Sequence, residues 1–155
     1  MDRFLELYEK VYIDMYRLAF FYLGNPQDAE DAVSETVLKA YEKFDTLRKD
    51  EAFRAWIFAI LVNQCKTKWK KRSCSETVEF KEEPSYTPSL EDHLLTADLL
   101  SCLSIEERKI VVLAVFGGYK GEEIAKILGH NHSTIRSKYR RALKKLERKL
   151  LAEEV

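Results

Sequence analysis

Glycine and proline are scarce in this 155-residue sequence, which has five glycines and three prolines. These residues build most tight turns, so their scarcity argues against a β-sandwich or barrel and favours helices. No apolar run reaches membrane-spanning length, and the N-terminal residues 1–10 are acidic and amphipathic rather than a signal sequence. The three cysteines, Cys65, Cys74 and Cys102, fit neither a disulfide framework nor a paired metal site, which indicates the reducing cytoplasm.

Charge of either sign is abundant but segregated. Hydrophobic residues make up 46% of the chain, enough for a packed core, and 26 acidic residues balance 26 basic ones. Residues 66–72 and 136–149 are strongly basic, whereas residues 28–35 and 76–92 are acidic. Two basic runs, each closing a helical pattern, suggest two contacts with a polyanion. The alternative is that both are solvated helix faces.

Apolar spacing of three and four residues predicts three helices in the first half, over about 4–23, 27–44 and 52–72. Gly24-Asn25-Pro26 separates the first two. The predicted core side of the second helix consists of Ala29, Val33, Val37, Ala40, Tyr41 and Phe44. Its other side carries an acidic stripe of Asp28, Asp31, Glu35 and Glu42. The third helix is predicted to bury Phe53, Trp56, Ile57, Ile60 and Leu61.

Residues 73–93 lose this periodicity. They contain two of the three prolines, several serines and threonines, and an excess of acids, which predicts a flexible linker. Helical pattern returns from about Leu94. Ser104 and Glu107 form a predicted capping box, and the apolar helix that they open, 105–116, is expected at the centre of a second domain, ending at Gly117-Gly118.

The most informative segment is 119–146. A short helix over 121–128 is followed by Gly129, where a tight turn needs positive φ, and Asn131 is placed to cap another helix. The predicted apolar stripe of this last helix is Ile135, Tyr139, Ala142, Leu143, Leu146 and Leu150. Its opposite face carries Ser133, Arg136, Ser137, Arg140, Arg141 and Lys144. Such a pattern predicts a helix-turn-helix that enters the DNA major groove, the alternative being an ordinary helical hairpin with a polar surface.

Both halves resemble the extracytoplasmic-function (ECF) sigma factors of bacterial RNA polymerase. Residues 28–44 resemble the family's region 2.2, residues 55–72 its regions 2.3 and 2.4, and residues 103–146 its region 4. Glu123 to Gly129 stand for the family's E-I-A-x-x-L-G, and Thr134 to Lys138 with Arg141-Ala142 stand for its T-V-[KR]-S-R-x-x-R-A. The resemblance implies an all-α protein of two small domains, 1–72 and 94–155, joined by the flexible linker 73–93.

The resemblance also implies partners and site residues. Region 2.2 would bind the clamp helices of the polymerase β′ subunit through Asp28, Asp31, Ser34 and Glu35. Regions 2.3 and 2.4 would bind the minus-ten promoter element, in part as single strand, with a base held in the loop 45–52. The expected contacts are Asn63, Lys66, Lys68, Trp69, Lys70, Lys71 and Arg72. Trp69 can either stack on a base or join the core, whereas Trp56 lies on the apolar stripe.

Region 4 would bind the minus-thirty-five element as duplex and touch the β flap of the polymerase. The expected DNA contacts are His132, Ser133, Thr134, Arg136, Ser137, Arg140, Arg141 and Lys144. The family further implies an anti-sigma factor, usually membrane-associated. Ser34 departs from the family, which usually has Gln there, and His130 and His132 replace apolar or small residues.

Other classes of function fit less of the sequence. A stand-alone helix-turn-helix regulator would account for 119–146 but leaves the first domain and its acidic stripe without a role. An enzyme is not expected, because the chain shows no nucleophile–base pair, phosphate loop or metal-ligand cluster, and its only histidines, His93, His130 and His132, fall in linker and turn. No catalytic residue, cofactor or metal is predicted.

Overall fold

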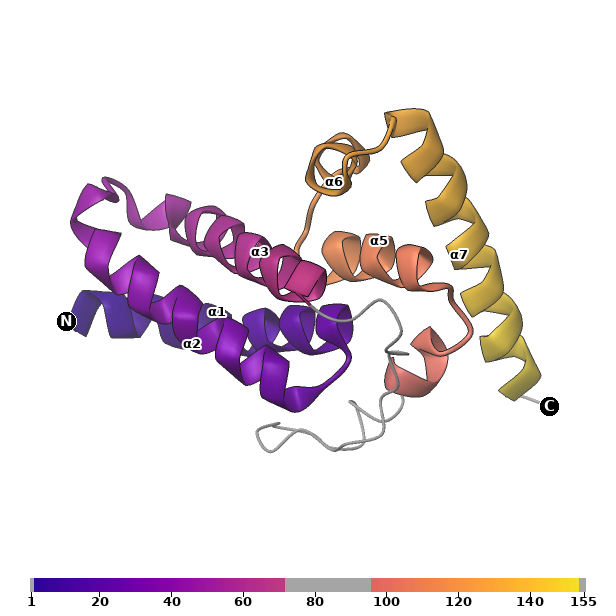
Figure 1. The fold of residues 1–155 in the computed structure, drawn as a ribbon, viewed down its shortest axis with the longest axis horizontal. Helices are drawn as coiled ribbons and strands as arrows, with labels where there is room; N and C mark the ends of the chain where they lie inside the picture. Colours follow the sequence, from indigo (N-terminus) through magenta and orange to yellow (C-terminus); the bar gives the residue numbers. More distant parts are fainter. Residues whose placement is uncertain (1, 72–95, 154–155) are drawn as a thin grey trace. The chain divides into compact units, whose positions relative to one another are not determined.

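The computed structural model describes residues 2–71 and 96–153 of the chain. It divides into two compact units, Met1–Pro88 and Ser89–Val155. Every regular element within the described residues is helical (Figure 1). The predicted linker 73–93, together with Arg72, Leu94 and Leu95, lies outside the described residues.

The first unit is a bundle of three helices, α1 (Asp2–Leu23), α2 (Pro26–Lys43) and α3 (Phe53–Lys71), each packed against the other two. The turn after α1 forms as predicted. Gly24 has φ 87°, Asn25 caps α2 by accepting a 2.7 Å hydrogen bond from the backbone N–H of Asp28, and Pro26 occupies the first helical turn. Two short 3₁₀ turns, η1 (Phe44–Thr46) and η2 (Asp50–Ala52), connect α2 to α3.

The buried face of α2 is rotated from the predicted one. It consists of Pro26, Ala29, Ala32, Val33, Thr36 and Ala40. Tyr41 was wrongly predicted to be core, since half of it is exposed and its ring meets Phe4 only edge-on at a centroid distance of 5.6 Å. Thr36 takes a buried place instead because its hydroxyl donates to the Ala32 carbonyl (2.7 Å), so that burial leaves no polar group unsatisfied.

Helix α3 is buried over a wider arc than its predicted stripe. Phe58, Val62 and Cys65 are buried along with Phe53, Ile57 and Leu61, whereas Trp56 and Ile60 are half-buried. Because α3 contacts both α1 and α2, two of its faces are covered rather than one. Burial raises the pKa of the Cys65 thiol to about 12, so this cysteine is a core residue without thiolate chemistry at neutral pH.

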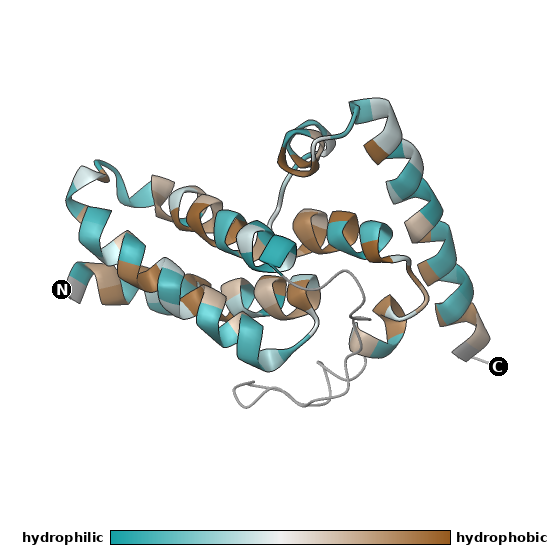
Figure 2. Ribbon diagram, viewed as in Figure 1, coloured by the Kyte–Doolittle hydropathy of each residue, from teal (hydrophilic) through white to brown (hydrophobic). Residues whose placement is uncertain are grey.

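The second unit contains α5 (Ile105–Val115), α6 (Gly121–Leu128) and α7 (His132–Glu153), preceded by a helical turn at 96–100. The predicted capping box opens α5. Glu107 N–H donates to Ser104 Oγ (3.2 Å) and Ser104 N–H donates to Glu107 Oε1 (2.9 Å). Figure 2 shows α5 as largely apolar and α7 as mostly hydrophilic with separate apolar residues.

The apolar stripe of α7 is narrower than predicted. Ile135 and Ala142 are buried, and Tyr139 and Leu146 are half-buried. Leu143 and Leu150 are wrongly placed in that stripe by the sequence pattern, since they are 45% and 48% exposed. Both lie at the edge of the stripe, where apolar character alone does not decide whether another helix covers the side chain.

Candidate nucleic-acid and protein interfaces

The acidic stripe of α2 is only partly open to solvent. Asp31, Ser34 and Glu35 are exposed. Asp28 is half-buried and takes part in the helix cap. The Asn25 side chain accepts a hydrogen bond from the Asp28 backbone N–H and donates one of 2.9 Å to the Asp28 carboxylate. Three of the four predicted polymerase contacts are therefore exposed on one helix, and the fourth holds the start of that helix.

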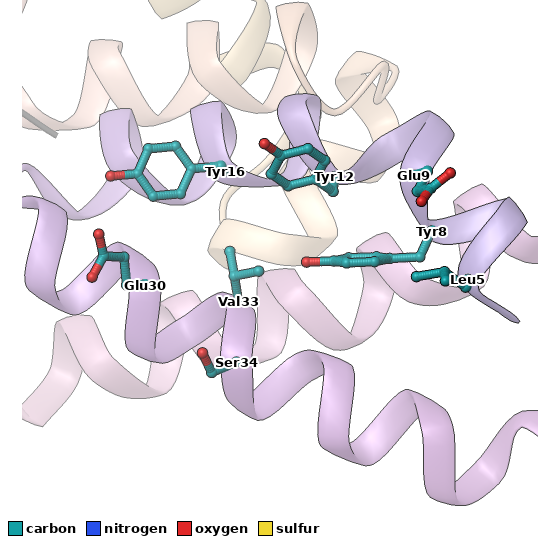
Figure 3. A pocket seen from close by; sticks show the side chains of 8 residues that line it. All are labelled: Leu5, Tyr8, Glu9, Tyr12, Tyr16, Glu30, Val33 and Ser34. Atoms are coloured by element: carbon teal, nitrogen blue, oxygen red, sulfur yellow. The ribbon is translucent and has the colours of Figure 1, made fainter. Parts of the chain in front are cut away.

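An open groove of about 620 Å³ lies beside this acidic stripe, between α1 and α2. Figure 3 shows tyrosine rings of α1 and side chains of α2 around it. The groove is lined by Leu5, Tyr8, Glu9, Tyr12, Tyr16, Glu30, Val33 and Ser34. The groove was not predicted from the sequence, although tyrosine recurs every four residues at positions 8, 12 and 16, which places the three rings on one face of a helix.

The groove is acidic as well as aromatic. Burial, and then the charge of Glu30, raise the pKa of Tyr16 to about 12, so its phenol stays protonated at neutral pH. Carboxylates at Glu9 and Glu30 beside aromatic faces suit a cationic side chain. Ser34, one of the predicted polymerase contacts, lines the groove and precedes Glu35 of the acidic stripe, so the groove adjoins that stripe.

A polar junction joins α2 to α3. Glu35 Oε1 pairs with Lys68 Nζ at 3.3 Å. When the Gln64 amide is oriented so that its nitrogen faces Glu35, it donates to Glu35 Oε2 at 2.7 Å and its oxygen accepts from Lys39 Nζ at 2.6 Å. Each helix contributes two residues four apart, which places them on one helix face. The junction therefore links a predicted polymerase contact, Glu35, to a predicted DNA contact, Lys68.

The remaining predicted minus-ten contacts that the structure describes lie in the second half of α3, whereas Arg72 falls outside the described residues. Asn63, Lys70 and Lys71 are exposed and Lys66 is half-buried. Asn63, Lys66 and Lys70 are spaced three and seven residues apart, so they share one face of the helix. Trp69 is half-buried and meets the Tyr22 ring edge-on at 6.4 Å, which makes it part of the packing between α3 and α1.

The helix-turn-helix forms with the predicted geometry. Gly129 closes α6 with φ 73°, a left-handed conformation that favours glycine. The His130 backbone N–H returns to the Ala125 carbonyl (3.0 Å), and the Asn131 carbonyl accepts from Ile135 N–H (3.1 Å) in the first turn of α7. Buried Ile124 of α6 and buried Ile135 of α7 anchor the two helices.

The predicted DNA face of α7 is open. Ser133, Arg136, Ser137, Arg140, Arg141 and Lys144 are all exposed, opposite the buried side chains of Ile135 and Ala142. Thr134 is half-buried. His132 is exposed, and its ring lies so close to Gly121 that a Cβ there would stand 3.0 Å from Nε2. The ring therefore also packs at the start of α6.

Three lysines of the basic run face the protein instead. Lys138 pairs with Glu106 (3.2 Å), Lys145 with Glu107 (2.8 Å) and Lys149 with Asp98 (3.5 Å). His130 also contacts Glu106. The basic run of 136–149 thus divides into an outward face with arginines and an inward row of lysines, a division that charge counting along the sequence missed.

Glu107, the acid that pairs with Lys145, is buried. Burial on its own would raise the pKa of its carboxyl, but hydrogen bonds from Lys145 and Ser104 lower the pKa below its ordinary value. The carboxylate therefore stays charged at neutral pH and joins the start of α5 to the middle of α7.

Neither a membrane-spanning helix nor a metal-binding cluster occurs in the parts of the chain that the structure describes. In 2–71 and 96–153, no helix is both long and apolar enough to cross a bilayer. The same residues contain no group of three or more His, Cys, Asp or Glu side chains placed to hold a metal ion.

A three-helix unit followed by a helix-turn-helix with a basic outer face defines a DNA-binding protein of two helical units. The family profile described as Sigma-70 region 2 matches residues 7–74, and that described as Sigma-70, region 4 matches residues 93–146. RNA polymerase sigma factor SigV of Bacillus subtilis is 35% identical over 150 residues, covering 92% of this chain and 87% of that protein. ECF RNA polymerase sigma factor SigM of Mycobacterium tuberculosis is 27% identical, covering 95% and 76%.

Solved structures resemble the chain as well. The sigma factor RpoE of Bartonella quintana, solved with the anti-sigma factor NepR, has a TM-score of 0.67 and 26% identity, covering 97% of this chain and 98% of that one. CnrH, solved with the cytosolic domain of CnrY, shares the fold with a TM-score of 0.61 and 23% identity, covering 96% and 88%. The chain belongs to the ECF class of RNA polymerase sigma factors. Because matches extend over both halves, the stand-alone regulator is not favoured.

Proposed function

We propose that this chain binds RNA polymerase core and directs it to promoters whose two elements are contacted by its two units. Residues 1–72 serve as the polymerase-binding and minus-ten unit, 73–93 as the linker, and 94–155 as the minus-thirty-five unit. The observation that carries the proposal is α7, whose six exposed polar and basic side chains lie opposite buried Ile135 and Ala142. A helix of this kind following a glycine turn suits the major groove.

The N-terminal part of α7 reads bases in this proposal. Arg136 lies in the first turns of the helix, where recognition helices meet base edges, so we assign it to base reading. Arg140 and Lys144 lie one and two turns further on and are assigned to phosphates. The inward lysines at 138, 145 and 149 are excluded from the DNA contacts because acids of the same unit bind them.

Single-stranded minus-ten DNA is assigned to the face of α3 that carries Asn63, Lys66 and Lys70, with Lys71 beside it. Ammonium groups along one face can follow a phosphate backbone. Trp69 is assigned to packing because of its contact with Tyr22. The loop with η1 and η2, at the N-terminal end of α3, is assigned to an unstacked base.

Polymerase binding is assigned to Asp31, Ser34 and Glu35 together with the groove between α1 and α2. The surface is acidic and aromatic, so it suits a basic helix of the β′ clamp. We extend the same region to an anti-sigma factor, membrane-associated as is usual in the family, because an inhibitor covering it would exclude polymerase. The protein then acts in the cytoplasm as an initiation factor with no catalytic step of its own.

Transcription in vitro tests the function directly. Purified chain is added to RNA polymerase core on a randomised promoter library, and the transcripts are sequenced. We expect start sites downstream of one pair of elements. Arg136→Ala should relax the sequence preference for the upstream element. Arg148→Ala, at another exposed cation of α7, serves as the control variant. Binding of duplex DNA without any effect on core polymerase would instead identify a stand-alone regulator.

A further inference from the structure

The strongest unassigned feature is the junction of Glu35, Lys39, Gln64 and Lys68 between α2 and α3. It unites two surfaces to which the proposed function gives different partners, polymerase and DNA. We propose that Glu35 is a positioning residue that neutralises Lys68 in the free protein, and that polymerase binding to Glu35 releases Lys68 to bind a phosphate of the minus-ten strand. This inference rests on the proposed function.

Glu35 and Lys68 differ in how much of each side chain a partner protein can reach. The Glu35 side chain is 50% exposed, whereas that of Lys68 is 19% exposed. A partner arriving on α2 can therefore reach Glu35 more readily than Lys68, most of whose side chain is covered. Half-exposed ion pairs are weakly held, so a partner cation can compete for the carboxylate.

Gln64 holds the carboxylate while this competition takes place. It is buried and donates to Glu35 Oε2, which leaves Oε1 as the oxygen of the ion pair with Lys68. A partner cation that binds Oε1 lies close to the Lys68 ammonium and repels it. At the other end of the amide, the Gln64 oxygen accepts a hydrogen bond from the Lys39 ammonium.

Release of Lys68 adds a cation beside the DNA-binding face of α3. Lys71 is exposed and follows three residues later on the same side of the helix as Lys68, so the freed ammonium joins it at the edge of the face that carries Asn63, Lys66 and Lys70. Each cation that neutralises a phosphate of single-stranded DNA steepens the dependence of log affinity on log salt by about 0.7. The proposal therefore predicts a steeper salt dependence in the presence of polymerase.

Lys68→Met tests the proposal, with Lys70→Met as the matched control. Binding of a fluorescent single-stranded minus-ten oligonucleotide is measured over a salt series, for the free protein and for the complex with saturating core polymerase. We expect Lys70→Met to reduce the slope by about 0.7 in both states. We expect Lys68→Met to leave the free protein unchanged and to reduce the slope by about 0.7 only in the complex.

Glu35→Gln provides the opposite perturbation. It keeps a side chain that Gln64 can contact but removes the charge. The slope of log affinity against log salt should therefore become steeper by about 0.7 in the free protein. The double variant with Lys68→Met should lose that increase. Circular dichroism checks that each variant folds.

Equal effects of Lys68→Met in both states, or none in either, would overturn the coupling while Lys70→Met still supports DNA binding by α3. No effect of Lys70→Met in the complex would instead contradict the proposed function.

Discussion

The buried contact between Glu107 and Lys145 offers the sharpest test of how α7 is held in its unit. Lys145→Met keeps most of the apolar stem but removes the ammonium that lies 2.8 Å from Glu107 Oε1. The Glu107 side chain is only 4% exposed, so water cannot replace the lost partner well. The capping contacts with Ser104 remain. We therefore expect Lys145→Met to lower the free energy of unfolding by about 1–2 kcal/mol, near the lower part of the range for a buried hydrogen bond to a charged group.

The effect should depend on pH in a defined direction. The pKa of Glu107 is lowered in the folded protein, so its contribution to stability is complete above the unfolded value of about 4.3 and is lost as pH falls through the lowered folded value. The difference between wild type and Lys145→Met should therefore be constant from pH 7 to about 5 and shrink at more acid pH.

Urea denaturation followed by far-ultraviolet circular dichroism measures this difference. Both tryptophans, Trp56 and Trp69, belong to the first unit, so their fluorescence follows that unit in the same titration. Lys144→Met is the matched control, because Lys144 is an exposed neighbour and should change stability by no more than about 0.5 kcal/mol. Equal losses in the two variants, or a difference that persists undiminished at pH 3, would refute the reasoning.

Three further outcomes are expected. Arg136→Ala should weaken binding to the upstream element by about 1–3 kcal/mol and relax the sequence preference, whereas Arg140→Ala should mainly reduce the slope of log affinity against log salt by about one. Both effects are measured by fluorescence anisotropy. Unchanged selectivity in Arg136→Ala would remove the base-reading role of Arg136. Asp31→Lys should lower affinity for polymerase core in a pull-down without changing the unfolding midpoint, since Asp31 is exposed; normal core binding would contradict the clamp assignment. Limited proteolysis should cut first within 73–93 and leave two resistant fragments, and a first cut elsewhere would contradict the predicted linker.

Features set by neighbours within four residues were predictable from the sequence. Asn25-Pro26 at the start of α2, the Ser104–Glu107 box of α5 and the left-handed Gly129 all form as expected. In each case the donor and acceptor, or the required φ, belong to the same short segment. Helix identity, the helix-turn-helix and the exposed side of α7 followed from this local chemistry and from apolar spacing.

Tertiary packing decided which face of each helix is covered. Burial of Phe58 and Val62, exposure of Tyr41 and Leu143, and the groove lined by Tyr8, Tyr12 and Tyr16 all depend on where a second helix lies. Apolar spacing gives the direction of a stripe but not its width. The width depends on how many neighbours a helix has, and α3 has two within its bundle.

Tertiary structure also decided the role of individual charges. Lys68 with Glu35 and Lys145 with Glu107 are separated by 33 and 38 residues in the chain. The sequence by itself determined that the chain has two basic helices and one acidic stripe. Only the fold determined which cations stay available to a partner, because an ion pair forms where distant helices bring opposite charges within contact distance, and no spacing along one helix encodes that meeting.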